Sequence, residues 1–339
     1  MATPSGMPKV TPERIFATLH GYQRSAALKA AIELGLFTAI GEGAKTVQAI
    51  AQKCKASERG VRILADYLVI DNMLTKSGSE YGLSEEAATF LDRRSQMYIG
   101  SASDFLVNEK SLTILTTLTE SVRNGGRRME ESGLNPEDPV WVSFARGMMP
   151  MMFPMAQMIA SVVKLPQDRD TKVLDIAASH GIFGIQMALA NPRARVVGLD
   201  WKIVLELTAE NAKRFGVGER FSSIAGSAFD VEFGGDYDLI LIPNFLHHFD
   251  VATCEKFLAK CAANLRSGGQ VAIVEFVPNE DRVSPPAPAG FALTMLGHTP
   301  HGDAYTEAEY RRMLGSSGFK DVTLRPLAPM PETLVLGTK

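Results

Sequence analysis

The strongest constraint on the fold is a regular alternation of strand-like and helix-like segments in the second half of the chain. Strand-like stretches occur at residues 172–178, 195–200, 221–225, 237–243 and 271–277, and the stretch at 237–243 is strongly apolar. Helical periodicity is shared by the intervening stretches at 181–190, 203–215 and 251–265. Strands that are apolar on both faces are typical of a parallel sheet covered by helices on each side. The sequence therefore predicts an α/β domain with a doubly wound parallel sheet.

The last forty residues predict how this sheet ends. A helix at 306–316 is followed by two strand-like stretches at 322–327 and 333–337. The link between the two strands is short and carries Pro329 and Pro331, so we expect a hairpin. A hairpin requires one strand to run antiparallel to the others, and we expect this strand at the edge of the sheet.

The first half of the chain has helical spacing from about residue 11 to 160. Apolar residues three and four positions apart predict one helix that includes residues 32–40, and a second helix at 46–53. Ser57 is the expected N-cap of a third helix that ends near residue 70. Ser77-Gly78-Ser79 separates two short β-prone stretches and predicts a hairpin. Helices followed by a small hairpin are the winged-helix arrangement.

Charge argues against a nucleic-acid partner for this winged helix. Residues 41–95 contain eight basic and eight acidic side chains, and the whole chain has a formal net charge of −3. DNA binding depends on neutralising phosphates with clustered positive charge. We therefore expect a scaffold and dimer interface here.

The apolar run at 271–277 contains Glu275 and is too short to span a membrane, and three cysteines give no disulfide framework. These features predict a cytoplasmic protein with no membrane partner.

Four strand ends in the second half carry residues suited to ligand binding. Ligands of open parallel sheets bind beyond the carboxyl ends of the strands. The first end, 173–181, finishes in small residues and Gly181 at the start of a helix, whose free N–H groups can hold a carboxylate. The second end carries Asp200, an acid placed to bind ribose hydroxyls. The third and fourth ends are the segments 225–229 and 243–248.

At these residues the chain resembles the class I S-adenosylmethionine-dependent methyltransferases. From about residue 11 to the end it resembles the small-molecule O-methyltransferase family, which includes plant caffeic acid, hydroxyindole and bacterial natural-product enzymes. The stretch 30–37, Ala-Ala-Ile-Glu-Leu-Gly-Leu-Phe, followed by a winged helix, is similar to the dimerisation domain of that family. The resemblance implies a Rossmann-like sheet, S-adenosylmethionine as cofactor and a homodimer. It also implies a dimerisation domain at 1–100, linking helices that line the acceptor pocket at 101–165, and a cofactor-binding domain at 166–339.

The resemblance also implies which residues bind the cofactor. They are Asp175, Ala177, Gly181, Asp200, Trp201, Ser227, Ala228, Phe229 and Asn244. Departures from the family pattern are Ala177, Ala178 and Ser179, where glycines are common, Ser227 in place of an acid, and Pro243 in place of the lysine of plant members. Alanine suits this loop only where the backbone is not left-handed.

The segment Leu246-His247-His248-Phe249-Asp250 resembles the Leu-His-Asp-Trp-Asp of the family, which implies that His247 is the general base. Imidazole has a pKa near 6.5 and accepts a proton near neutral pH. Glu275 stands in an apolar strand, where an unpaired acid is costly, and the resemblance implies that it orients His247. Asp303 lies in a segment that resembles the loop before the last helix of the family. Adjacent histidines point in divergent directions and no third ligand has zinc-type spacing, so we expect no metal.

Methionines cluster before the first strand of the sheet, where the resemblance places the acceptor-pocket helices. They are Met148, Met149, Met151, Met152, Met155 and Met158. Flexible, polarizable thioethers conform to flat ligands, although most of the six are expected in the core. The expected acceptor residues are Phe105, Asn108, Met148, Met152, Phe291 and Met295, with His298. Such a pocket suits an apolar, aromatic or polyketide-like acceptor with a hydroxyl group.

One alternative stays open and two others are disfavoured. The altered residues of the first loop and Ser227 are compatible with an enzyme of the same fold that binds the cofactor but performs hydroxylation, decarboxylation or a pericyclic step. A winged-helix transcription regulator with a ligand-sensing domain is disfavoured by the charge balance. A nicotinamide dehydrogenase is disfavoured by Asp175 in the first strand and by the closing hairpin.

Overall fold

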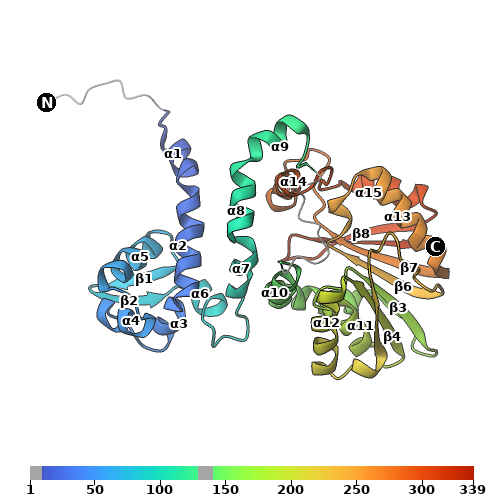
Figure 1. The fold of residues 1–339 in the computed structure, drawn as a ribbon, viewed down its shortest axis with the longest axis horizontal. Coiled ribbons are helices and arrows are strands. Elements are labelled where there is room, and N and C mark those ends of the chain that lie inside the picture. Colours follow the sequence, from blue (N-terminus) through green and yellow to red (C-terminus); the bar gives the residue numbers. More distant parts are fainter. Residues whose placement is uncertain (1–9, 129–139) are drawn as a thin grey trace. The chain divides into compact units, whose positions relative to one another are not determined.

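The computed structural model describes residues 10–128 and 140–339 (Figure 1). Residues 1–9 and 129–139, which fall in the predicted segments 1–100 and 101–165, lie outside the described residues. The chain divides after Asn108 into two compact units, residues 1–108 and 109–339. Each unit is described by itself below.

The first unit is helical with one small hairpin. Its elements are α1 (Glu13–Leu19), α2 (Gly21–Glu33), α3 (Leu36–Gly41), α4 (Val47–Cys54), α5 (Glu58–Ile70), β1 (Leu74–Ser77), β2 (Glu80–Leu83), α6 (Glu85–Phe90), η1 (Gly100–Ala102) and α7 (Ser103–Leu106). The predicted N-cap Ser57 accepts a hydrogen bond from the Gly60 N–H. The two strands pair antiparallel from Leu74 opposite Leu83 to Ser77 opposite Glu80. The predicted winged-helix arrangement is confirmed.

One predicted helix of the first unit is wrong. Residues 32–40 do not belong to a single helix, because α2 ends at Glu33 and α3 begins at Leu36. Gly35 separates them with φ +67°, a left-handed conformation that suits glycine and ends a helix. The apolar spacing continues through this break because Ile32, Leu36 and Phe37 all face the same buried core. Periodicity alone therefore could not reveal the break.

The second unit begins with α8 (Glu109–Thr116), α9 (Leu118–Asn124) and α10 (Val140–Val162). The alternating part consists of β3 (Thr171–Ile176), α11 (Ile182–Ala190), β4 (Ala194–Asp200), α12 (Lys202–Arg214), η3 (Gly218–Arg220), β5 (Phe221–Ala225), β6 (Tyr237–Pro243), η4 (Leu246–His248), α13 (Val251–Asn264) and β7 (Leu265–Glu275). The chain ends with α14 (Pro286–His298), α15 (Glu307–Ser316), β8 (Lys320–Pro326) and β9 (Thr333–Thr338). The strand order is β5-β4-β3-β6-β7-β9-β8.

The sheet confirms the predicted α/β fold and corrects one position in it. Strands β3 to β7 pair in parallel, and β8 and β9 form the predicted hairpin. The antiparallel strand β9 does not lie at the edge, since it is inserted between β7 and β8. Burial explains this order: Leu334 and Val335 of β9 are fully buried, whereas β8 carries exposed residues such as Lys320 and Arg325. The apolar strand is covered on both sides and the polar strand forms the edge.

Helix α14 has no counterpart among the predicted elements. Its N-terminal residues, Pro286 and Pro288, are typical of loops, but proline is compatible with the first turn of a helix. Within the described ranges, none of the helices has the length and apolar character needed to cross a membrane.

Candidate active site

The four strand ends singled out in the sequence meet at one edge of the sheet. Strand β3 lies between β4 and β6, with Asp175 opposite Gly198 on one side and Leu241 on the other. Asp200 ends β4 opposite Ala225, the last residue of β5. The loops that follow β3, β4, β5 and β6 therefore begin side by side. This is the place where open parallel sheets bind their ligands.

The loop after β3 has a strained backbone. Ala177 and Ser179 have φ values of +49° and +53°, in the left-handed region that suits glycine. Alanine was expected to suit this loop only if its backbone were not left-handed, and Ala177 is left-handed. The left-handed conformation of Ala177 and of Ser179 costs about 1–2 kcal/mol of conformational energy for each residue. Asp200 holds the loop: its Oδ2 accepts the Ser179 N–H at 2.7 Å and its Oδ1 accepts the Trp201 N–H at 2.6 Å. Strained backbone of this kind is concentrated at functional sites.

Asp175 joins the first strand to the helix that follows. It is fully buried, and its Oδ2 accepts the Gly184 N–H in the first turn of α11 at 2.9 Å. A Cβ on Gly184 would lie 2.9 Å from the same oxygen, so glycine permits this approach. Burial raises the pKa of Asp175 to about 8.

This pKa predicts how stability depends on pH. The folded-state pKa of Asp175 lies above the value of about 3.9 in unfolded chains. Its contribution to stability is therefore complete below about pH 4 and is lost as the pH rises through 8. Asp175→Asn cannot ionise, so its free energy of unfolding should rise relative to wild type by up to about 1.4 kcal/mol per pH unit between pH 5 and 8. Urea unfolding at each pH measures this difference, and a constant difference would contradict the prediction.

Three buried polar atoms at this edge have no hydrogen-bond partner among the described residues. They are Oδ1 of Asp175, Oγ of Ser179 and Oδ1 of Asn244. Asn244 follows β6 with φ +51°, and its Nδ2 donates to the sulfur of Met152 in α10 at 3.8 Å. Unpartnered buried polar atoms are unfavourable unless a ligand or water satisfies them. These oxygens fit a ligand that carries both a positive charge and hydroxyl groups.

The loop after β5 presents an aromatic surface. Phe229 is 37% exposed and lies against Phe245, Phe249 and Phe257, with ring centroids 4.9–6.0 Å apart. Lys260 holds the loop by donating to the backbone carbonyls of residues 228, 229 and 231.

The same loop leaves one hydrogen-bond donor uncommitted. The Ser227 hydroxyl oxygen accepts the Phe229 N–H at 3.2 Å. The loop can therefore offer an aromatic face and a hydroxyl proton to a planar base.

His247 and Glu275 form a buried pair. His247 lies in the turn η4 after β6, and Glu275 is the last residue of the neighbouring strand β7. The Nδ1 of His247 is 2.6 Å from Oε2 of Glu275. Oε1 of Glu275 accepts the backbone N–H groups of Phe245 and His247 at 3.0 and 3.3 Å. Every oxygen of this fully buried carboxylate is thus hydrogen-bonded, which makes its burial tolerable.

This geometry determines which ring nitrogen can act as a base. A carboxylate can only accept, so Nδ1 of His247 carries the proton of the shared hydrogen bond. Nε2 is then the atom with a free lone pair. The neighbouring His248 does not compete, because burial and the charge of His247 lower its pKa to about 3. Its Nδ1 lies 3.1 Å from the Phe245 carbonyl. No group of three potential metal ligands occurs within residues 10–128 and 140–339.

Aromatic side chains surround the His247 ring. Phe291 of α14 meets this ring edge to face, with centroids 4.8 Å apart, and Phe276 stacks on Phe291 at 4.0 Å. Phe276 was not among the expected residues, although its position directly after Glu275 was a usable signal. Met295 is buried one turn beyond Phe291 in α14.

The other expected acceptor residues belong to α10 and to the first unit. Met148 and Met152 are buried in α10, and Met152 contacts Asn244. Phe105 and Asn108 belong to the first unit, where the Asn108 amide donates to the Phe105 carbonyl at 2.6 Å. The acceptor role of these side chains stays a prediction.

The segment 302–305 contacts the histidine turn through its backbone. The Asp303 N–H donates to the His247 carbonyl at 3.0 Å, and the Tyr305 hydroxyl donates to the Phe249 carbonyl. A Cβ on Gly302 would lie 2.2 Å from the His247 carbonyl oxygen, so only glycine fits. The sequence marked this segment through Asp303, but the contact of Asp303 with the turn uses its backbone N–H, which no residue pattern specifies.

Two family models match the chain. The O-methyltransferase domain matches residues 137–320, more than half of the chain, and the O-methyltransferase dimerisation domain matches residues 16–93. Among curated proteins, a 3-hydroxy-5-methyl-1-naphthoate 3-O-methyltransferase of Streptomyces sahachiroi is 28% identical, over 94% of this chain and 93% of that protein.

Solved structures agree with these matches. A crystal structure of a candidate O-methyltransferase from Nostoc punctiforme PCC 73102 is 48% identical, with a TM-score of 0.93 over 98% of this chain and 100% of that one. Human N-acetylserotonin methyltransferase in complex with S-adenosylmethionine has the same fold, with 21% identity and a TM-score of 0.84 over 98% of this chain and 99% of the human one. On this evidence the chain belongs to the S-adenosylmethionine-dependent O-methyltransferase family.

Proposed function

We propose that this enzyme methylates a hydroxyl group of a small aromatic molecule and that His247 is its general base. The observation that carries the proposal is the buried pair of His247 and Glu275, in which Nδ1 is committed to the carboxylate and Nε2 is left to accept a proton. A base of this kind is what O-methylation requires of the protein, because the cofactor contributes the leaving group.

The strand ends supply groups suited to S-adenosylmethionine. Asp200 at the end of β4 is proposed to accept the ribose hydroxyls, while Ser227 and Phe229 are proposed to contact the adenine. The oxygens of Asp175, Ser179 and Asn244 that lack a partner among the described residues are acceptors suited to the ammonium group. Ala177, Gly181, Trp201 and Ala228 are proposed to line the same pocket through their backbone. When bound, the cofactor supplies a sulfonium methyl group as the electrophile.

The proposed step at the histidine is a proton transfer. With the cofactor bound, the acceptor hydroxyl would give its proton to Nε2 of His247 while its oxygen displaces the sulfur from the methyl carbon. Glu275 keeps the proton of Nδ1 in place and stabilises the imidazolium that results. Phe291 meets the ring edge to face and Phe276 stacks on Phe291. This apolar surface favours a flat aromatic acceptor and excludes water. The naphthoate enzyme of Streptomyces sahachiroi acts on an acceptor of this class.

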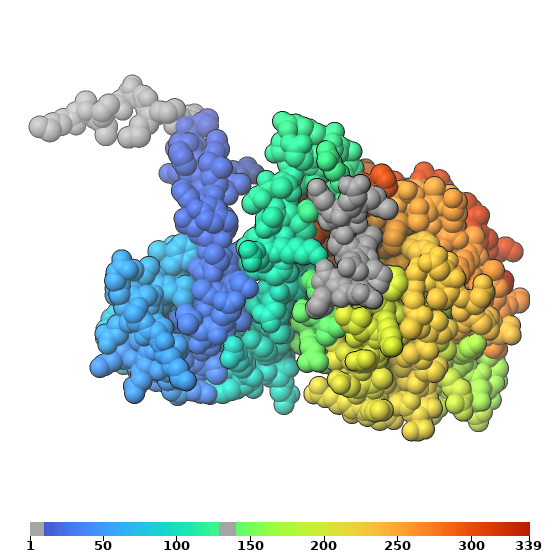
Figure 2. Space-filling view, viewed as in Figure 1, coloured from blue at the N-terminus to red at the C-terminus, as the bar shows by residue number. Residues whose placement is uncertain are grey.

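We also propose a cytoplasmic homodimer assembled through the first unit. Helix α1 and the start of α2 carry large apolar side chains that are exposed in the single chain: Ile15 (64%), Phe16 (55%), Leu19 (64%) and Tyr22 (67%). This stretch is the upper part of the dark blue column in Figure 2. Exposed apolar groups of this density typically mark an interface. Sedimentation of the full chain would reveal the dimer.

An acceptor screen tests the proposed function. The purified protein is incubated with S-adenosylmethionine labelled in its methyl group and a panel of phenols, naphthols, quinols and polyketides. We expect labelled product and S-adenosylhomocysteine in equal amounts with at least one aromatic hydroxyl compound. Cofactor consumption with an unmethylated product would favour another reaction on the same fold, and failure to bind the cofactor would overturn the proposal.

The proposed role of Asp200 predicts pH-dependent cofactor binding. Burial raises the pKa of Asp200 to about 6, partly offset by the Ser179 and Trp201 N–H groups. If the ionised carboxylate accepts the ribose hydroxyls, affinity should fall about tenfold between pH 7 and pH 5 as the group becomes protonated. Calorimetric titration with S-adenosylmethionine measures this change. Asp200→Asn should bind more weakly at both pH values and lose the pH dependence; a variant with the same pH dependence as wild type would remove Asp200 from this role.

A further inference from the structure

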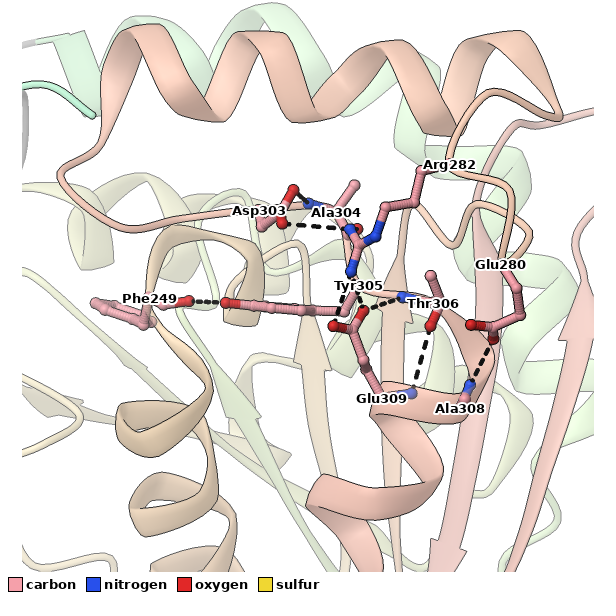
Figure 3. Close-up of polar contacts among 9 residues, drawn as sticks. All are labelled: Phe249, Glu280, Arg282, Asp303, Ala304, Tyr305, Thr306, Ala308 and Glu309. Carbon is pink, nitrogen blue, oxygen red and sulfur yellow. Dashed lines mark hydrogen bonds and ion pairs between the residues drawn. The ribbon is translucent and has the colours of Figure 1, made fainter. Parts of the chain in front are cut away.

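Arg282 lies at the centre of a polar network outside the proposed pocket (Figure 3). Its Nη2 donates to both carboxylate oxygens of Glu309 at 2.8 Å. Its Nη1 donates to Oδ2 of Asp303 at 3.3 Å and to the carbonyl of Ala304 at 3.4 Å. Two residues earlier, Glu280 accepts the Ala308 N–H at 3.1 Å. The connection from β7 to α14 is thus fastened at two points to the segment that begins α15.

The partners of Arg282 belong to the segment that supports the histidine turn. Asp303 receives the guanidinium on its side chain and donates its own N–H to the His247 carbonyl. Glu309 receives the guanidinium and also completes the capping box of α15 with Thr306. Tyr305, between them, donates to the Phe249 carbonyl. Only one residue therefore separates the arginine from the backbone of His247.

The same arginine lies on the connection that leads to α14. Arg282 stands four residues before Pro286, the first residue of α14, and this helix carries Phe291 to the edge of the imidazole. The other end of the connection is Glu275, the hydrogen-bond partner of the ring. The segment 276–285 therefore joins two groups that contact the ring, and Arg282 ties this segment to Asp303, which contacts the backbone of His247.

The local backbone presents the arginine for these contacts. Arg282 has φ +55°, a left-handed conformation that costs about 1–2 kcal/mol for a residue with a Cβ. A dense set of hydrogen bonds holds the turn around it: Asn279 bonds to Ser284 through backbone and side chain, and Asp281 accepts the N–H groups of Val283 and Ser284. Non-glycine residues persist in such conformations where the surrounding structure fixes them.

We propose that Arg282 is a positioning residue for His247: through Asp303 and Glu309 it holds the histidine turn and the connection to α14 in the geometry required for proton transfer. This inference rests on the proposed role of His247 as the base. The Arg282 side chain is 45% exposed, and ion pairs this exposed contribute little to stability. Small displacements of a catalytic group, by contrast, reduce rates strongly. A loss of activity without a loss of stability would therefore identify positioning.

The experiment compares Arg282→Ala and Arg282→Lys with Arg311→Ala in the full-length protein. Arg311 is a matched control because it is 47% exposed and pairs with Glu307 on the same helix, α15, without contacting the histidine turn. The first readout is the downfield proton resonance of the Nδ1–H of His247, assigned by its absence in His247→Ala. It needs no acceptor, so it tests the inference even if the acceptor screen fails.

We expect this resonance to exchange with water at least fivefold faster in Arg282→Ala than in wild type, with Arg282→Lys intermediate and Arg311→Ala unchanged. With an aromatic hydroxyl compound from the screen, kcat should fall about tenfold in Arg282→Ala, while the KM for S-adenosylmethionine stays within twofold. A resonance and kcat like those of wild type would overturn the proposal. Equal losses in Arg282→Ala and Arg311→Ala would also overturn it, since they would reflect general destabilisation.

Discussion

Replacing His247 by alanine is expected to lower kcat by about 10²- to 10⁴-fold. The variant removes the imidazole at the end of β6, whose Nδ1 is hydrogen-bonded to Glu275 and whose Nε2 is left to accept a proton. The backbone N–H groups that bind Glu275 come from the turn itself and are retained. Cofactor affinity should therefore stay within a few fold. Turnover with saturating acceptor and calorimetric titration with S-adenosylmethionine measure the two quantities.

His301→Ala serves as the control for this variant, because His301 is an exposed histidine directly before the segment 302–305 that contacts the histidine turn. It should retain kcat within about twofold. Turnover of His247→Ala close to that of wild type would show that another group accepts the proton or that none is needed. A large loss of cofactor affinity would instead mean that the histidine turn shapes the cofactor pocket.

Replacing Glu275 by glutamine is expected to reduce kcat by about 10²- to 10⁴-fold, although the side chain keeps its size. The amide oxygen of glutamine can still accept the Phe245 and His247 N–H groups, as Oε1 of Glu275 does. The amide NH₂ then faces Nδ1 of His247, where wild type has an acceptor 2.6 Å away. The imidazole of His247 must then adopt the other neutral tautomer, in which Nε2 carries the proton. In that tautomer Nε2 cannot accept a proton from the substrate.

Glu332→Gln is the matched control, since Glu332 is also a buried glutamate, beside the β9 residue Thr333 that pairs with Glu275. Burial raises the pKa of Glu332. The hydrogen bonds of the His247–Glu275 pair do not involve Glu332, so its replacement by glutamine leaves them in place. We expect kcat of this variant within about twofold of wild type. Glu275→Gln with the same small effect would mean that the carboxylate does not select the tautomer of His247.

Much of this fold follows from local patterns in the sequence. The stretches 221–225 and 237–243 are strands with the predicted bounds, and the second is buried along its whole length, as its apolar character predicts. The hairpin at 74–83 and the cap at Ser57 depend on neighbouring residues alone. The helix predictions failed where a local pattern is compatible with two structures. The apolar face at 32–40 continues through the break at Gly35, so it suits one helix or two. The proline-rich start of α14 suits a loop or the first turn of a helix.

The sequence by itself determined the alternation of strands and helices, and with it the edge at which Asp175, Asp200 and Asn244 meet, because parallel strands end on the same side. It also singled out His247 and Glu275 as chemically unusual residues. Only the tertiary structure decided that β9 lies inside the sheet, that the Ala177 backbone is left-handed and that Arg282 is joined to the histidine turn. These features depend on contacts between residues far apart in the chain, and on backbone groups that every residue shares. Their arrangement is selected by burial and hydrogen bonding in the whole fold.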